Sequence, residues 1–104
     1  MNNKHVYIFG LGESGLSAAK YFYKRGVNYY AWDDNSSVRK KSYFTIKKNL
    51  LKNIQEIKEQ EISMVIVSPG IRIDHPLLKK FCKMNVPIYR DLEIFSQNVD
   101  KKNV

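Results

Sequence analysis

Residues 5–15 read HVYIFGLGESG. The first five are β-branched or aromatic and stop at a glycine, which is typical of a buried parallel strand. The spacing Gly10-x-Gly12-x-x-Gly15 follows at once, and apolar or small residues then recur at helical spacing over 13–25. Such a turn lets backbone approach a ligand and directs the free N–H groups of the first helical turn at anionic or carbonyl acceptors. The stretch therefore predicts a strand, a ligand-binding glycine turn and a helix.

The rest of the chain continues this alternation. It predicts strands at 27–32, 64–67 and 86–89, a helix beginning at His75-Pro76, and a helix capped by Asp91. We expect the serines of the polar cluster 33–37 to cap the next helical turn. Together these elements predict one Rossmann-like α/β domain over 1–96, an open parallel sheet of about five strands with helices on both faces. Residues 97–104 read as a polar tail.

The stretch 38–61 supports two interpretations. Ile46, Leu50, Ile54 and Ile57 fit one helical face, whereas residues 43–46 could equally form a short strand. The sequence is compatible with either a helix or a strand in this segment.

Composition argues against several function classes. The formal net charge of +8 would usually indicate an anionic partner. However, the chain is rich in Lys, Asn, Ile and Tyr, which all have A- and T-rich codons, and its lysines are scattered over several segments. We therefore attribute the lysines to genome composition and expect no nucleic-acid partner.

Membrane and metal functions are also not expected. No run approaches the roughly 20 apolar residues that span a bilayer, and no secretory leader is recognisable. Cys82 has no second cysteine for a disulfide or a Cys-rich metal site. We expect a soluble, cytoplasmic chain with no membrane partner and no resident metal.

Candidate binding residues follow from the fold class, because ligands of open parallel sheets lie beyond the carboxyl ends of the strands. Asp33 or Asp34 could accept a hydrogen bond from a ribose hydroxyl or from an N–H of a base. Alternatively, the two residues could form a solvated turn and helix cap. The turn after residue 67 suits a diphosphate or a sugar, or is structural. The candidates are Gly12, Glu13, Ser14, Gly15, Asp33, Asp34, Asn35, Ser68, Pro69 and Gly70. No P-loop is present, so ATP binding by that device is not predicted.

Five short motifs, taken together, carry a family resemblance. In order they are GLGESGLSAA at 10–19, WD at 32–33, VSPGI at 67–71, HPLL at 75–78 and DLEIF at 91–95. Over nearly the whole chain they resemble the N-terminal domain of the D-glutamate-adding Mur ligases of peptidoglycan synthesis, the MurD family. The VSPGI turn and the DLEIF helix are more specific than the glycine turn.

The resemblance implies that this domain binds the uridine diphosphate part of UDP-N-acetylmuramoyl-L-alanine. Glu13 and Ser14 would contact the nucleotide through backbone N–H groups. Asp33 and Asp34 would meet the uracil, and Ser68 would lie at the diphosphate or sugar. Asn35 stands where some members carry an arginine against the base.

The resemblance also implies what this chain lacks. Family members are three-domain, ATP-dependent, amide-bond-forming ligases whose phosphate loop, Mg²⁺ ligands and glutamate site belong to the later domains. We therefore expect no catalytic residue and no cofactor here, with residues 97–104 leading toward an absent ATP-binding domain. No specific protein partner is implied. The alternative is an NAD-type dinucleotide-binding regulatory or oxidoreductase domain.

Overall fold

The computed structural model describes residues 4–72 and 74–90. Its elements are β1 (His5–Phe9), α1 (Glu13–Lys24), β2 (Tyr29–Trp32), α2 (Ser36–Ser42), the 3₁₀ turns η1 (Lys48–Leu50), η2 (Ile54–Glu56) and η3 (Glu59–Glu61), β3 (Ile62–Val67), α3 (Pro76–Lys83) and β4 (Ile88–Tyr89). The predicted helix at Asp91 and the tail 97–104 lie outside the described residues.

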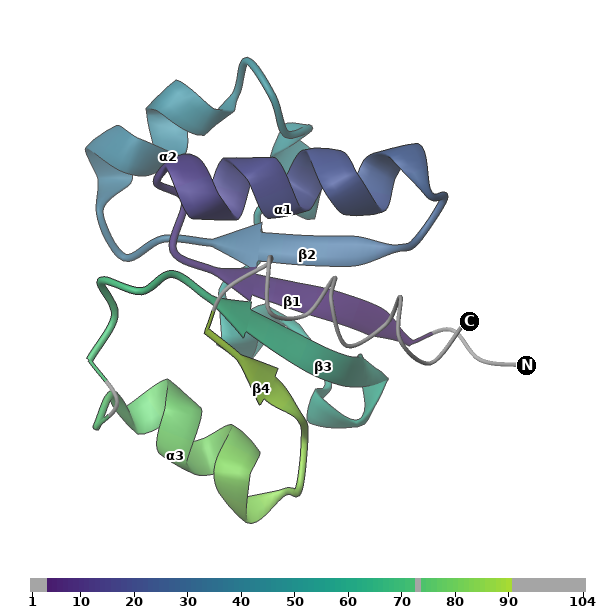
Figure 1. Ribbon diagram of the computed structural model, residues 1–104, viewed down its shortest axis with the longest axis vertical. Coiled ribbons are helices and arrows are strands. Elements are labelled where there is room, and N and C mark those ends of the chain that lie inside the picture. Colours follow the sequence, from purple (N-terminus) through teal and green to yellow (C-terminus); the bar gives the residue numbers. More distant parts are fainter. Residues whose placement is uncertain (1–3, 73, 91–104) are drawn as a thin grey trace.

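The four strands lie side by side in the order β2-β1-β3-β4, and every pairing is parallel (Figure 1). The order reverses at β1, because the chain first moves outward to β2 and then returns past β1 to β3. A reversal of this kind opens a crevice at the carboxyl ends of the central strands. The predicted α/β fold with an open parallel sheet is confirmed.

Both faces of the sheet are buried, which is why β1 reads as a continuous apolar run. Val6 and Ile8 belong to a core that also contains residues of α1, whereas Tyr7 and Phe9 belong to a second core that contains residues of α3. Helices therefore cover both faces of the sheet, as predicted.

The sheet has four strands over the described residues, rather than about five. Residues 43–46 form turns in which the N–H groups of Thr45 and Ile46 both donate to the carbonyl of Ser42. Next to β2 the ladder gains only one isolated parallel bridge, between Ala31 and Leu51. The backbone of residues 43–46 forms its hydrogen bonds within local turns, so these residues do not add a strand to the edge of the sheet.

The single helical face is not formed either. Ile46 and Leu50 pack with the α1-side core, whereas Ile54 and Ile57 pack with the α3-side core. The segment thus passes around the β2 edge from one face of the sheet to the other. These four residues have helical spacing, but they pack against two different cores in succession.

Capping hydrogen bonds define one end of each of the three helices. Lys24 is the last residue of α1, and the N–H of the C-cap Arg25 bonds to the carbonyl of Phe22. Asn35 caps α2 through its side chain, so the predicted cap by Ser36 or Ser37 is wrong by one or two residues. His75 caps α3, with Pro76 as the first helical residue. Over 4–72 and 74–90, no helix is both long and apolar enough to cross a bilayer.

Candidate functional site

Three turns meet at the carboxyl ends of β1, β2 and β3: residues 10–15, 33–35 and 68–71. We call the surface that these turns form the crevice. The N–H of Gly10 bonds to the carbonyl of Trp32 at 2.8 Å, and the N–H of Ser68 bonds to the carbonyl of Phe9 at 3.0 Å. A Cβ added to Gly10 would lie 2.6 Å from Cβ of Ser68. The structure therefore brings together all three segments that the strand-end rule selects.

The carboxylate of Asp33 is a structural brace within the crevice. Oδ2 accepts the backbone N–H of Leu11 at 2.8 Å, and Oδ1 accepts the N–H of Asn35 at 2.9 Å. Each oxygen thus holds a different turn, and the side chain links the glycine turn to the start of α2. An additional ligand N–H would have to share one of these oxygens, since a carboxylate oxygen has two lone pairs.

The first turn of α1 is open to a ligand. Gly12 occupies the N-cap position and supplies no side-chain acceptor. Gly12, Glu13 and Ser14 are exposed, whereas Gly15 is buried against the backbone of Gly10. Helix N-termini that lack a side-chain cap leave N–H donors and the positive end of the helix dipole facing outward. Such an arrangement suits an anionic group.

Asp34 and His75 connect the second turn to α3. Nδ1 of His75 accepts the N–H of Leu77 at 3.1 Å, which assigns the ring proton to Nε2. Nε2 lies 3.3 Å from Oδ2 of Asp34 and donates to it. Asp34 stays 67% exposed, so its carboxylate is accessible to solvent. Sequence reasoning treated His75 as a helix-start residue, which is correct, but missed its bond to Asp34.

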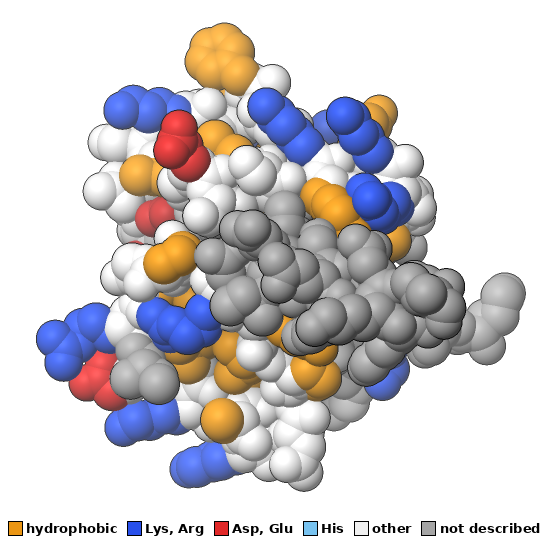
Figure 2. Space-filling view, viewed as in Figure 1, with side chains coloured by type: hydrophobic (Ala, Val, Ile, Leu, Met, Phe, Trp, Pro, Cys, Tyr) orange, Lys and Arg blue, Asp and Glu red, His pale blue; other side chains and the backbone are white. Residues whose placement is uncertain are grey.

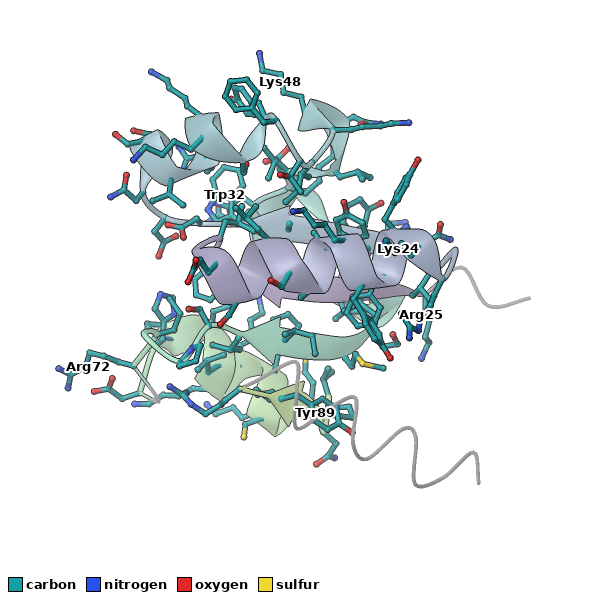
Figure 3. All side chains as sticks on the ribbon, turned by 45° about the horizontal axis from the view of Figure 1, so that its top comes forward. Lys24, Arg25, Trp32, Lys48, Arg72 and Tyr89 are labelled. Atoms are coloured by element: carbon teal, nitrogen blue, oxygen red, sulfur yellow. The ribbon has the colours of Figure 1, made fainter. Side chains whose placement is uncertain are left out.

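Asn35 and Arg39 organise the start of α2. Oδ1 of Asn35 accepts the N–H groups of Ser37 and Val38, so this predicted site residue is occupied as a cap. Arg39 donates to the carbonyl of Asp33 at 2.6 Å and stacks over the ring of Trp32 at 4.3 Å. Trp32 lies near the start of α1 in Figure 3. A cation after the second strand was not predicted from the sequence.

The third turn is held by an arginine from the next strand end. The N–H of Ile71 bonds to the carbonyl of Ser68 at 3.0 Å and closes the turn, leaving Pro69 and Gly70 exposed. Nη2 of Arg90 donates to the carbonyls of Pro69 and Ile71. Arg90 follows β4, so the strand-end rule could have found it. Arg72, by contrast, points away from the molecule in Figure 3 and pairs with exposed Asp74.

A cavity of 290 Å³ adjoins Asp34 on the α3 side of the sheet, with Tyr7 among its lining residues. Burial, and to a lesser degree the charges of Asp34 and Glu56, raise the pKa of the Tyr7 phenol. The hydroxyl therefore stays protonated and donates to the carbonyl of Lys52 at 3.0 Å. Tyr7 thus ties the residues between η1 and η2 to the sheet.

The described part of the chain contains no group of three or more His, Cys, Asp or Glu residues that could hold a metal ion. Asp33 and Asp34 lie in the same turn, but their carboxylates have the separate partners given above. For binding, the crevice offers the backbone donors at the start of α1 and the exposed carboxylate of Asp34, while Asp33 holds the turns.

A pair of substitutions at His75 separates its two roles. His75→Asn is expected to keep the cap of α3, because Asn accepts well at N-caps, and to lose the bond to Asp34. His75→Ala loses both and is expected to lower the free energy of unfolding by about 1 kcal/mol. Urea unfolding followed by Trp32 fluorescence measures both. Equal losses in the two variants would mean that the cap does not contribute.

The fold and the crevice define a Rossmann-like α/β domain with a glycine turn at its first helix. The family model for the Mur ligase MurD-like N-terminal domain matches residues 4–90. The chain belongs to this family of Mur ligase N-terminal domains.

Curated relatives agree with the family. A UDP-N-acetylmuramoylalanine--D-glutamate ligase of Wolbachia pipientis wMel is 34% identical over 94 residues, which cover 89% of this chain and 18% of the relative. The ligase of that name from Rickettsia bellii is 30% identical over 92 residues, covering 88% and 20%. One from Buchnera aphidicola subsp. Schizaphis graminum is 32% identical over 99 residues, covering 90% and 22%. The chain thus spans about a fifth of the length of these relatives.

Proposed function

We propose that this domain binds the uridine diphosphate part of UDP-N-acetylmuramoyl-L-alanine in the crevice. The observation that carries the proposal is the convergence of three turns around the uncapped start of α1, in a chain that belongs to the MurD-like family. The diphosphate would lie at the N–H groups of Glu13 and Ser14, a position favoured by the helix dipole. The exposed carboxylate of Asp34 would accept a hydrogen bond from the uracil.

The other predicted site residues would have different roles in binding. Ser68 would face the diphosphate or the sugar, with exposed Pro69 and Gly70 at the rim of the crevice. Asp33 would act mainly by holding the glycine turn, because both of its oxygens already accept backbone N–H groups. Asn35 would contribute through α2, whose N-terminus it caps.

We also propose the wider role that the relatives' name suggests. Residues 1–96 would form the substrate-binding domain of a cytoplasmic ligase that joins D-glutamate to UDP-N-acetylmuramoyl-L-alanine. Residues 97–104 would lead to an ATP-binding domain, and ATP and Mg²⁺ would act there. This chain alone would bind substrate without catalysing the reaction.

Calorimetry or ligand-observed NMR on the 104-residue chain tests the binding proposal. We expect saturable binding of UDP-N-acetylmuramoyl-L-alanine and of UDP, and none of NADH. Saturable NADH binding without a response to either uridine compound would favour the dinucleotide-binding alternative. A folded sample that responds to no ligand would contradict both.

Ser14→Asp is expected to lower UDP affinity about tenfold, which corresponds to about 1.4 kcal/mol. A carboxylate in the first helical turn repels the diphosphate but interacts favourably with the helix dipole, so thermal stability should not fall. The matched control is Ser17→Asp, which adds the same charge at another exposed position of α1. Isothermal titration with UDP measures the effect. Equal affinities in the two variants would place the diphosphate elsewhere.

A further inference from the structure

The segment after α2 has an unusual distribution of charge and exposure. Residues 40–48 read KKSYFTIKK, so a pair of lysines stands on each side of an aromatic pair. Between residues 35 and 55 there are six Lys or Arg residues and no Asp or Glu. Codon bias accounts for the number of lysines in the chain, but not for where the fold places them on the surface.

The fold places this segment at the surface with its aromatic tip in solvent. Phe44 is 96% exposed, because the turn over 43–46 directs Ile46 into the core and Phe44 outward. A protruding apolar ring stands at the top of Figure 2, where Figure 1 places the turn after α2. The ring of Phe44 stays in water when the chain folds, so a partner surface that buries it would remove apolar area from water.

The lysines on both sides of the tip are exposed as well: Lys40, Lys41, Lys47 and Lys48. Lys48 holds its ammonium 4.9 Å from the centre of the Tyr43 ring, and Figure 3 shows Lys48 beside a ring at the top of the molecule. Arg39 and Lys52 are used elsewhere, in the contacts with Asp33 and Glu56. The surface thus consists of Phe44 and four flanking ammonium groups, and we call it the basic-aromatic tip.

We propose that the basic-aromatic tip docks on an anionic lipid surface, with Phe44 inserted at the level of the headgroups. Lysines close to anionic lipids each add to binding, and an apolar ring among them adds a non-electrostatic part. The exposed charges are lysines, point charges that suit a diffuse anionic surface, rather than arginines, which suit fixed bidentate contacts.

A single-stranded nucleic acid fits the tip less well. Such ligands use a groove that follows the backbone and several rings on which bases stack. Here Phe44 stands on a convex turn, and the neighbouring Tyr43 ring has an ammonium over it. The tip also lies away from the crevice, because the strands in Figure 1 end at the left and the turn after α2 lies at the top. The tip and the crevice are therefore separate parts of the surface. Docking on a lipid surface would reverse the expectation of no membrane partner.

Vesicle flotation tests the proposal with the 104-residue chain at physiological ionic strength. The probes are vesicles of phosphatidylglycerol mixed with phosphatidylcholine, vesicles of pure phosphatidylcholine, and single-stranded DNA. We expect the chain to float with the anionic vesicles only. Equal flotation with both vesicle types, or flotation with neither, would overturn the proposal. So would tighter binding to the DNA than to the anionic vesicles.

Two variants and one control locate the surface. Replacing Lys40, Lys41, Lys47 and Lys48 by Gln is expected to weaken vesicle binding on the order of a hundredfold. Phe44→Ser, at a position that does not support the fold, should weaken it about tenfold while leaving the charge unchanged. The control replaces four other exposed lysines by Gln and so removes the same charge: Lys20, Lys24, Lys79 and Lys83. An equal loss in the control would show that net charge alone drives binding and would overturn the assignment.

Discussion

Gly15→Ala is expected to lower the free energy of unfolding by about 3 kcal/mol, the upper end of the usual cost of overpacking. The added Cβ would lie 1.8 Å from the carbonyl oxygen of Gly10. The obstacle is backbone rather than a flexible side chain, so the turn and the start of α1 must move apart. Because small domains have only about 5–15 kcal/mol of stability, this loss should be evident as a much lower melting temperature.

Gly12→Ala is the matched control for this substitution. It lies in the same turn, but nothing stands within 4 Å of its added Cβ. Its melting temperature, measured by circular dichroism, should stay close to that of the parent chain. Equal losses at the two positions would show that the close approach of Gly15 to Gly10 does not determine the stability of the turn.

Asp33→Ala is expected to lower the free energy of unfolding by about 2–3 kcal/mol. The substitution leaves the N–H groups of Leu11 and Asn35 without their acceptor, and hydrogen bonds to charged groups are worth about 1.5–3 kcal/mol each before partial exposure reduces them. Urea unfolding gives the total, and hydrogen exchange at the Leu11 amide should become faster. Loss of this brace should also weaken UDP binding in samples that remain folded.

Asp34→Ala removes the same charge from the neighbouring position and serves as the control. Its carboxylate is 67% exposed and its hydrogen bond to His75 is long, at 3.3 Å, so the stability loss should stay below about 0.5 kcal/mol. If the two alanine variants were equally stable, Asp33 would not act as a brace. A loss of UDP affinity in Asp34→Ala without a loss of stability would support its proposed contact with the base.

The crevice was accessible from sequence because it depends on strand ends. A run such as 5–9 predicts a strand by itself, and parallel strands put their carboxyl ends at one edge, so residues 10–15, 33–35 and 68–71 had to converge. The turns of 43–46 were not accessible in this way. Tyr43 and Phe44 suit a strand as well as a turn, and the choice depends on whether Ile46 can reach the α1-side core.

Contacts between distant side chains could not be predicted either. The bond between His75 and Asp34 spans 41 positions, and no local pattern indicates which of two adjacent carboxylates faces α3. Arg90 reaches the carbonyl of Ile71 across 19 positions only because β4 lies beside β3.

The sequence by itself determined the alternation of strands and helices, the glycine turn and the three segments of the crevice, because these follow from local periodicity and from residues that only certain backbone conformations accept. Only the tertiary structure decided that Asp33 braces the glycine turn, that residues 46–57 serve two cores in succession, and that Phe44 stands in solvent between lysines. Those outcomes depend on which groups compete for the same core space and the same hydrogen bonds, and that competition exists only once the sheet has formed.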